Sequence, residues 1–489
     1  MFELLTPEQM NAADHRTIDG GVPGYELMKA AGRAVAEAAQ RLMPEARRVH
    51  ILAGTGNNGG DGFVAAKLLN DAWRDVRVTV IGDVSKISGD AKQAFDEWDE
   101  GLSDFSAEAL AEADLVIDAL FGAGLSRPIE GPLAEMIEAI NRSGKPVLSV
   151  DLPSGVDGGT GEVRGAAIRA AATMTFFRKK PGHLLFPGRG HCGRIHVADI
   201  GIPAGVLAGL DVRTVENTPW LWRAQYPVPG DDGHKFTRGH AVVLSGPAHA
   251  TGAARLSAGA ALRAGAGLVT LASPTDAMKV NAAHLTAVML REVETADTLS
   301  EMLADPRITS VLLGPGLGVG ERTRDMVSVA AKAGKRLVLD ADALTSFESD
   351  PDALFALIGE SAGAILTPHE GEFGRLFGRG DADKMGRATH AAERSGAVVI
   401  LKGADTVVAS PDGRCSINAN APPWLATAGS GDVLAGIAAG LLAPGMPVFE
   451  AASAAVWLHG LSGQAAGPGL TAEDLDAGLK SAIASLFSS

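Results

Sequence analysis

The segment ATAGSGDVLAG, residues 426–436, combines residue types that suit phosphoryl transfer. Gly429 and Gly431 let the backbone approach a ligand closely, and the apolar run after them predicts a helix over residues 433–442. The first amides of a helix have no partner inside it, so they favour a phosphate. Asp432 lies beside them and is itself an anion. It either caps the helix or takes a proton from a hydroxyl that attacks a phosphoryl group held on those amides.

A second set of polar residues follows short apolar runs in the first half of the chain. Asn58 lies in GTGNNGGDG, Asp118 precedes a glycine-rich loop, and Asp151 and Ser154 lie in VDLPSGVDG. An amide, a carboxylate and a hydroxyl at Asn58, Asp118 and Ser154 would form an oxygen-lined site for a hard cation. The alternative is that these residues only cap helices and turns, as their types commonly do.

The same region also contains a dinucleotide-binding pattern. Residues 54–59 match GxGxxG, and Asp83 ends the next predicted strand near the distance expected of a ribose-binding acid. A dehydrogenase is therefore an alternative function. Against it, Asp61 lies in the first turn of the predicted helix, where its charge would repel a pyrophosphate.

Parallel strands joined by crossover helices must position these residues, because short β-branched and apolar runs alternate with alanine-rich segments. In the first half the pattern predicts strands at residues 50–53, 76–81, 115–118, 147–150, 174–177 and 195–198. In the second half it predicts strands at residues 241–244, 268–271, 311–313, 337–339, 364–366, 398–401 and 406–409. Ligands of such sheets bind beyond the carboxyl ends of the strands, where the glycines and acids lie.

Length and composition restrict the class of protein. The 489 residues exceed what one core usually serves, which predicts two α/β domains, and the Pro-rich polar segment near residues 202–238 indicates a connection between them. The net charge of −15 disfavours nucleic acid and anionic membranes as partners, so a small-molecule ligand is expected. Apolar runs stay below the ~18 residues of a membrane span.

Two distant cysteines, Cys192 and Cys415, indicate neither a disulfide framework nor a zinc site. The N-terminal residues do not read as a signal peptide, so we expect a cytoplasmic protein.

Four segments of the first half resemble the epimerase domain of the NAD(P)H-hydrate repair enzymes: GTGNNGGDGFVAAKLL, DALFGAGLSRP, VDLPSGVDGGTG and KKPGHLLFPG. The resemblance implies a Rossmann-like αβα domain over residues 1–214 that interconverts the R and S hydrates at C6. It implies that the hydrated nucleotide contacts Asn57, Asn58, Gly59, Gly60, Asp61, Gly122, Ala123, Gly124, Leu125, Ser126, Arg127, Pro128 and Asp151.

The same resemblance assigns roles in this half. It implies that potassium binds Asn58, Asp118 and Ser154. Asp151 is expected to perform acid–base chemistry at C6. Lys180, in KKPG, could serve by its charge, although an exposed lysine before a turn is the commoner explanation.

Seven segments of the second half resemble the ribokinase-like dehydratase domain of the same enzymes: RGHAVVLSG, ATGAARLSAGAALRAGAGLVTLAS, LLGPGLG, LVLDADAL, ILTPHEGEFGRL, VVILKGADTVVAS and ATAGSGDVLAG. This implies a second αβα domain over residues 239–489, joined through residues 215–238. The implied substrate contacts are Ala253, Gly316, His369 and Asp432, and the implied nucleotide contacts are Lys402, Gly403, Ala404, Asp405, Thr406 and Gly431.

Two residues of this set have simpler structural explanations. The sequence also departs from the family pattern at two places. Taken alone, Lys402 could be a surface lysine and His369 a helix cap or core histidine. Residues 420–425 read NAPPWL where the family has Gly-Asn-Pro-Gly-Met, and Glu370 replaces a proline.

The implied function is repair of hydrated NADH and NADPH. The dehydratase would phosphorylate the C6 hydroxyl of the S hydrate, with Asp432 as general base, and then expel phosphate. ADP (or ATP) is the expected phosphoryl donor, with AMP and phosphate as products from ADP, together with magnesium. We also expect a homo-oligomer. The remaining alternatives are a ribokinase-like small-molecule kinase, which would release a stable phosphorylated product, and a noncatalytic nucleotide sensor.

Overall fold

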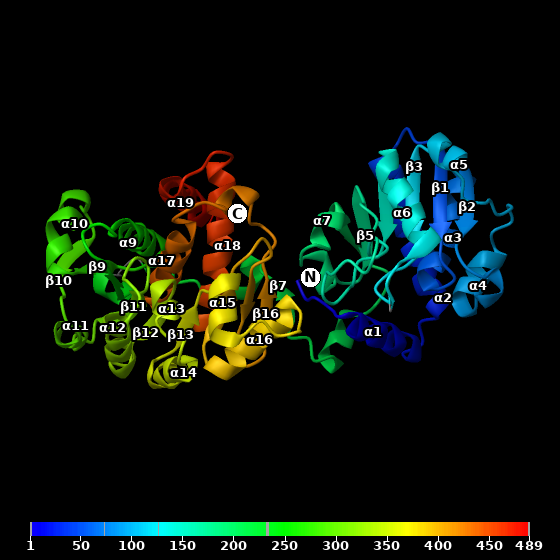
Figure 1. The fold of residues 1–489 in the computed structure, drawn as a ribbon. Coiled ribbons are helices and arrows are strands. Elements are labelled where there is room, and N and C mark those ends of the chain that lie inside the picture. Colours follow the sequence, from blue (N-terminus) through cyan, green and yellow to red (C-terminus); the bar gives the residue numbers. More distant parts are fainter. Residues whose placement is uncertain (1, 73, 126, 231–233, 488–489) are drawn as a thin grey trace. The chain divides into compact units, whose positions relative to one another are not determined.

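The computed structural model describes residues 2–72, 74–125, 127–230 and 234–487. The chain divides into two compact units, Met1–Thr214 and Val215–Ser489. Each unit has one sheet with helices on both of its faces, as Figure 1 shows. The predicted fold class, two α/β units of three layers each, is confirmed.

The first unit has a six-stranded parallel sheet with the order β2-β1-β3-β4-β5-β6. Its strands are β1 (Arg48–Ala53), β2 (Asp75–Val80), β3 (Leu115–Ala119), β4 (Val147–Val150), β5 (Ala172–Phe176) and β6 (Arg194–Ala198). Its helices are α1 (Pro7–Asp19), α2 (Gly24–Leu42), α3 (Asn57–Asp71), α4 (Gly89–Asp96), α5 (Ala107–Glu112), α6 (Gly131–Ser143) and α7 (Arg189–Cys192).

Apolar side chains are buried on both faces of this sheet. In β3, Leu115 and Ile117 pack with residues of α2 and α3, whereas Val116 packs with residues of α5 and α6. A strand that is buried on both faces needs apolar residues at successive positions. This is why the strands are visible in the sequence as continuous apolar runs.

The second unit has a ten-stranded sheet with the order β10-β9-β8-β11-β12-β13-β14-β15-β16-β7. Its strands are β7 (Thr214–Glu216), β8 (His240–Leu244), β9 (Leu268–Ser273), β10 (Met289–Glu292), β11 (Ile308–Leu313), β12 (Arg336–Leu339), β13 (Ala364–Leu366), β14 (Val398–Leu401), β15 (Val407–Ala409) and β16 (Cys415–Ile417). Its helices are α8 (Pro219–Trp222), α9 (Gly252–Ala264), α10 (Met278–His284), α11 (Ala296–Leu303), α12 (Glu321–Lys332), α13 (Asp342–Thr345), α14 (Pro351–Glu360), α15 (Glu370–Phe377), α16 (Lys384–Ser395), α17 (Ser430–Leu442), α18 (Val448–Ala466) and α19 (Leu475–Ser485).

The predicted strands all form, but one of them has the opposite direction. Residues 406–409 are predicted as one more strand of a parallel sheet, whereas β15 pairs antiparallel with β14 and with β16. Only residues 402–406 separate β14 from β15, too few for a crossover helix, so the chain makes a hairpin there. The sequence pattern also missed β7, β10 and β16, which have only three or four residues each.

Part of the expected connection belongs to the second unit. Of residues 215–238, β7 lies beside β16 in the sheet, and the Trp222 side chain is completely buried. The Trp222 indole Nε1 donates a hydrogen bond of 3.2 Å to the Asn217 side-chain oxygen. A polar, Pro-rich segment therefore contributes both a strand and a core aromatic residue.

Helices α9 and α17 pack closely in the second unit because glycine removes side chains from their interface. A Cβ atom at Gly436 of α17 would clash with the Ser257 carbonyl oxygen of α9, and one at Gly440 would clash with the Ala261 carbonyl oxygen. The Ser257 hydroxyl donates to the Asp432 carbonyl oxygen at 2.9 Å. The position of α17 is therefore determined by contacts with the α9 backbone.

In the described ranges, every helix is either too short or too polar to cross a lipid bilayer.

We expect Gly436→Ala to destabilise the second unit by roughly 1–3 kcal/mol, because the added methyl group must displace a backbone rather than a flexible side chain. The matched control is Gly259→Ala on α9, where a Cβ meets nothing within 4 Å. This control should stabilise the chain by up to about 1 kcal/mol through helix propensity. Urea unfolding measures both changes, and equal stability of the two variants would contradict the packing described here.

Candidate active sites

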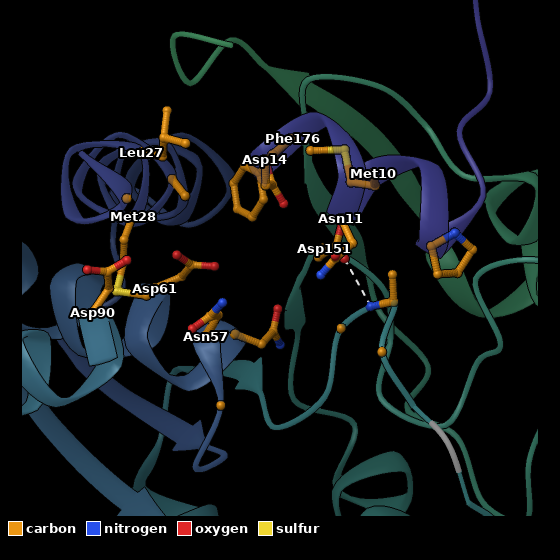
Figure 2. Close-up of a pocket in the computed structure, with 18 of the residues that line it drawn as sticks. Met10, Asn11, Asp14, Leu27, Met28, Asn57, Asp61, Asp90, Asp151 and Phe176 are labelled. Carbon is orange, nitrogen blue, oxygen red and sulfur yellow. Dashed lines mark hydrogen bonds between the residues drawn. The ribbon is translucent and has the colours of Figure 1, made fainter. Parts of the chain in front are cut away.

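The first unit contains a pocket of about 510 Å³ at the carboxyl ends of β1, β3, β4 and β5, covered by α1 and α2. Figure 2 shows this pocket. Seven of the predicted substrate contacts line it: Asn57, Asn58, Asp61, Gly122, Ala123, Gly124 and Asp151. Apolar side chains of Met10, Leu27, Met28 and Phe176 lie on the same wall as polar ones, so the pocket can seat a flat, partly polar ring.

The other predicted contacts of this half lie elsewhere. Gly59 and Gly60 are buried in the first turn of α3, and a Cβ at Gly59 would clash with the Gly54 carbonyl oxygen. Leu125, Arg127 and Pro128 belong to the loop after β3, beyond the residues that line the pocket. Ser126 lies outside the described residues. Gly54 and Gly59 of GxGxxG thus permit the tight packing of the loop that begins α3, whereas a Cβ at Gly56 would meet nothing within 4 Å.

Asp151 is fixed by four neighbours at the end of β4. Its carboxylate accepts hydrogen bonds from the Ala123 amide at 3.0 Å, the Thr175 hydroxyl at 2.9 Å and the Lys180 ammonium at 2.5 Å. Its carbonyl oxygen lies 2.8 Å from His183 Nε2. The backbone of Asp151 has φ 62°, a left-handed conformation that is costly for a residue other than glycine. The neighbours therefore hold a strained residue in place.

Lys180 is a buried partner of Asp151. Its side chain is only 1% exposed, and its ammonium also lies 3.0 Å from the Thr175 hydroxyl. The interpretation of Lys180 as an exposed lysine is therefore wrong. Burial alone would raise the pKa of Asp151, but the Lys180 charge and its hydrogen bond hold that pKa below its usual value. Asp151 is thus ionised at neutral pH.

Two of the other carboxyl groups that line the pocket differ from Asp151 in their pKa. Burial raises the pKa of Asp14, on α1, to about 6, with the negative charge of Asp151 adding to the effect. Burial also raises the pKa of Asp61 well above its usual value, again with a contribution from Asp151. The pocket therefore combines an ionised carboxylate with groups that hold a proton at a higher pH than an ordinary aspartate does.

Asp118 and Ser154 lie together beneath the pocket. The Ser154 hydroxyl and amide donate to the Asp118 carboxylate at 2.5 and 2.8 Å, and the Ser149 hydroxyl donates at 2.9 Å. Asp118 is completely buried, and its contacts with these residues and the Leu120 amide come from neutral groups. Burial consequently raises the pKa of Asp118.

The Asn58 side-chain nitrogen is also buried, and among the described residues it has no hydrogen-bond partner. The Asn58 oxygen would lie 2.9 Å from a Cβ placed at Gly122. A buried carboxylate with neutral partners and the side-chain oxygen of Asn58 fit an oxygen-coordinated cation such as potassium. Capping alone does not explain Asp118, whose carboxylate bonds side chains on the neighbouring strand and loop.

Asp432 lies in the first turn of α17. The N-cap of α17 is Gly429, with φ 83°, and the helix begins at Ser430, so the prediction of a helix over residues 433–442 started it three residues late. Asp432 is therefore inside the helix, and the alternative in which it is the N-cap is wrong. Burial raises the pKa of Asp432 to about 6, and the nearby Asp340 carboxylate raises it further, against the opposing effect of Lys402.

Lys402, which is half-buried, and the buried Asp340 form an ion pair beside this turn. The Lys402 ammonium lies 2.8 Å from the Asp340 carboxylate and 3.9 Å from the Glu372 carboxylate. A Cβ placed at Gly431 would lie 3.5 Å from the same ammonium. Lys402 is thus a site residue rather than a surface lysine. Its position depends on its amide, which donates to the Pro368 carbonyl oxygen at 2.9 Å.

The predicted nucleotide contacts form the turn between β14 and β15. The Thr406 hydroxyl donates to the Gly403 carbonyl oxygen at 2.9 Å, and Lys384 pairs with Asp405 at 2.5 Å. Ala404 lies within this turn. These bonds fix the backbone next to Lys402.

The predicted substrate contacts of this half lie on different loops. Ser257 bonds the carbonyl oxygens of both Ala253 and Asp432, so the start of α9 lies next to α17. Gly316 has φ 66° in the loop after β11, and its carbonyl oxygen approaches the loop after β8 so closely that a Cβ at Gly246 would clash with it.

His369 is the N-cap of α15. Its Nδ1 accepts from the amides of Gly371 and Glu372, and the Glu372 carboxylate accepts from the His369 amide in return. The imidazole is 56% exposed, and its Nε2 lies 3.5 Å from the Glu372 carboxylate. The reading of His369 as a helix cap is therefore right, and it does not prevent contact with a ligand.

Sequence reasoning missed four acids of these sites: Asp14, Asp90, Asp340 and Asp342. Asp340 and Asp342 follow β12 in VLDADAL, and the same strand-end rule that selected Asp118 and Asp151 could have identified them. Asp14 lies in a polar helix with several other charged residues, and the sequence carries no signal that would distinguish it.

Comparison with known proteins gives matches over both units. A family model described as NAD(P)H-hydrate dehydratase matches residues 241–479, and one described as YjeF-related protein N-terminus matches residues 24–182. The ADP/ATP-dependent NAD(P)H-hydrate dehydratase of Bacillus subtilis, crystallised with ATP and Mg²⁺, matches with 27% identity and a TM-score of 0.47, covering 55% of this chain and 98% of its own.

Two curated relatives match along almost their full length. The bifunctional NAD(P)H-hydrate repair enzyme of Thermofilum pendens is 36% identical over 469 residues, which cover 91% of this chain and 88% of the relative. That of Moorella thermoacetica is 36% identical over 494 residues, which cover 95% of this chain and 92% of the relative. The chain belongs to the family of bifunctional NAD(P)H-hydrate repair enzymes, with an epimerase in its first half and a dehydratase in its second.

Proposed function

We propose that the pocket of the first unit epimerises hydrated NADH and NADPH at C6, and that the Asp432 site dehydrates the S hydrate through a phosphorylated intermediate. The observation that supports the second assignment most directly is the position of Asp432 in the first turn of α17, beside backbone amides that have no partner within the helix. A carboxylate there accepts a proton where an anion can bind.

The chemistry of the hydrate explains why the Asp432 carboxylate and the backbone amides beside it are both needed. The C6 hydroxyl is a poor leaving group until it is phosphorylated. Asp432 takes its proton as the oxygen attacks the terminal phosphoryl group, while the amides of residues 429–431 hold the negative charge on the phosphoryl oxygens. The lone pair of the ring nitrogen then expels phosphate, and C5 loses a proton, which restores the dihydronicotinamide.

ADP is the proposed phosphoryl donor, giving AMP and phosphate. Lys402 and the turn at residues 403–406 would contact it, together with Gly431, which lies against the Lys402 ammonium. Magnesium would accompany the phosphates and neutralise part of their charge. Asp340 and Asp342 are the acids near Asp432 that could offer it oxygen ligands.

Epimerisation at C6 needs a base and an acid. When the base takes the C6 hydroxyl proton, the C6–N1 bond breaks, a carbonyl group forms at C6, and N1 takes a proton from the acid. Rotation about the C5–C6 bond and reversal of these steps close the ring on the other face and return both protons. Asp151 is the proposed base, since Lys180 keeps it ionised.

We further propose that potassium binds at Asn58, Asp118 and Ser154. The support is the completely buried Asp118 carboxylate, whose described contacts are neutral. A cation there would compensate the buried charge and fix the loops that follow β1 and β3.

For the dehydratase, we expect a mixture of both NADH hydrate epimers to recover its near-ultraviolet dihydronicotinamide absorbance when ADP is added, and Asp432→Asn to slow this recovery about 10²–10⁴-fold. The rate of the wild type should rise with pH through about 6, because the base must be ionised. The control is Asp476→Asn, an exposed acid on α19.

The stability of Asp432→Asn shows whether its slower recovery of absorbance comes from a lost catalytic group or from a damaged fold. A folded-state pKa above the usual value means that the ionised Asp432 destabilises the protein at neutral pH, so the variant should melt at the same temperature as the wild type or higher. Recovery with neither ADP nor ATP in the wild type would exclude the dehydratase assignment. Recovery with ATP only would exclude ADP as the donor.

For the epimerase, we expect Lys180→Met to leave a buried, unpaired carboxylate, which should cost about 3–5 kcal/mol of stability and raise the pKa of Asp151. The double variant Asp151→Asn/Lys180→Met should recover most of this stability but no epimerase activity. Chemical unfolding and separation of the epimers by chromatography measure the two effects. Full epimerase activity in Lys180→Met would contradict the role of this ion pair.

For potassium, we expect a higher melting temperature of the first unit in potassium chloride than in choline chloride at equal ionic strength. A ligand at about 100 times its Kd stabilises a protein by roughly 2.7 kcal/mol. Asn58→Ala should remove the difference, whereas Asn57→Ala should keep it. Equal melting of the wild type in the two salts would mean that no potassium binds.

A further inference from the structure

The pocket of the first unit contains more carboxyl groups than its proposed base requires. Asp151 is paired with Lys180 and serves as the base. Asp14, Asp61 and Asp90 line the same pocket from α1, α3 and α4. Epimerisation by ring opening also needs a group that gives a proton to the ring nitrogen and later takes it back. This inference rests on the epimerase function proposed above and concerns which of these acids is that group.

Asp14 differs from each of the other acids. In the part of the chain that the structure describes, no side chain or amide forms a hydrogen bond or ion pair with its carboxyl group, whereas Asp151 accepts three hydrogen bonds. Asp61 is buried in the first turn of α3. Asp90 is half-buried like Asp14, but it lies beside Met28, away from Asp151, as Figure 2 shows. Asp14 is therefore the half-buried acid that lies near Asp151 and has unused hydrogen-bonding capacity.

The direction of Asp14 also fits the role. Figure 2 shows its carboxyl group pointing from α1 toward the cavity and lying near Asp151, which reaches the cavity from the end of β4. Met10, Leu27 and Phe176 contribute the apolar surface near these groups, which suits a dihydronicotinamide ring. A ring that lies there can contact both the base and the unpaired acid.

We propose that Asp14 is the general acid of the epimerase and donates a proton to N1 of the substrate as Asp151 takes the proton of the C6 hydroxyl. The C6–N1 bond breaks with its electron pair on N1, and a C6 carbonyl group replaces the hydroxyl. On closure, N1 returns its proton to Asp14 and Asp151 returns its proton to the oxygen. Both residues recover their starting state without a net change in the bound protons.

The charges around Asp14 are consistent with this role. Asp151 raises its pKa and Lys180 and His15 lower it, while burial has the largest effect and brings the pKa to about 6. Asp61 and Asp90 face the same cavity. An acid with a pKa near the working pH can both give and regain a proton readily.

The test follows the epimerisation of the pure R hydrate of NADH by chromatography, with a blank that contains no enzyme. Asp14→Asn should lower kcat about 10²–10⁴-fold with little change in KM. Asp14→Glu should retain part of the activity. The matched control Asp19→Asn, an exposed acid on the same helix, should equal the wild type. Dehydration of the pure S hydrate with ADP should be unchanged in each variant, which shows that the second unit is intact.

The pH profile separates a chemical role from a structural one. Since the acid must be protonated, kcat/KM of the wild type should fall as pH rises through about 6, and Asp14→Asn should lack this limb. If Asp14→Asn does not melt cooperatively, the pH profile of Asp14→Glu provides the test instead. A glutamate can still donate the proton, so the fall of kcat/KM with rising pH must persist in that variant and shift in pH.

Two results would overturn the inference. One is an Asp14→Asn rate within about threefold of the wild type, below the general-acid contribution expected. The other result is a pH profile of kcat/KM that no longer falls with rising pH in Asp61→Asn but still falls in Asp14→Asn. In either case an inactive Asp151→Asn would leave the epimerase function intact. A wild type that does not epimerise the R hydrate would instead contradict the proposed function itself.

Discussion

Parallel pairing of the strands is the constraint on which both sites depend. Each crossover returns the chain to the start of the next strand, so the strands from β1 to β5 and from β8 to β14 end at one edge of their sheet. Beyond this edge, the backbone N–H and C=O groups have no neighbouring strand with which to form hydrogen bonds. Loops rich in glycine and acidic residues supply hydrogen-bond partners for these groups and form the walls of a site.

The two units use the same electrostatic arrangement. In each, one lysine pairs with one carboxylate: Lys180 with Asp151, and Lys402 with Asp340. A neighbouring carboxyl group, Asp14 or Asp432, has no such partner among the described residues and has a raised pKa. Pairing lowers the pKa of Asp151, whereas burial raises the pKa of Asp14 and of Asp432 toward neutral pH, so residues of one type can acquire different chemical roles.

Much of this was predictable from the sequence, because the signals are local. Strands buried on both faces read as apolar runs, and residues that follow them, such as Asp118, Asp151 and Lys402, could be identified by position alone. Signals that depend on the tertiary fold were not visible. Nothing in the sequence distinguishes Asp14 from other helical acids, because its role depends on α1 covering the pocket. Lys180 looked exposed because its burial depends on Asp151, a distant residue. The start of α17 was misplaced because Gly429 supplies a left-handed N-cap without a side chain.

The left-handed backbone at Asp151 restricts how this protein can change during evolution. Glycine, asparagine and aspartate tolerate that conformation, and most other side chains would strain the loop. Asparagine is one base change from aspartate and keeps the shape of the side chain without its charge. That change would also leave the buried Lys180 ammonium without its carboxylate, so the backbone conformation and the ion pair together oppose substitution at this position.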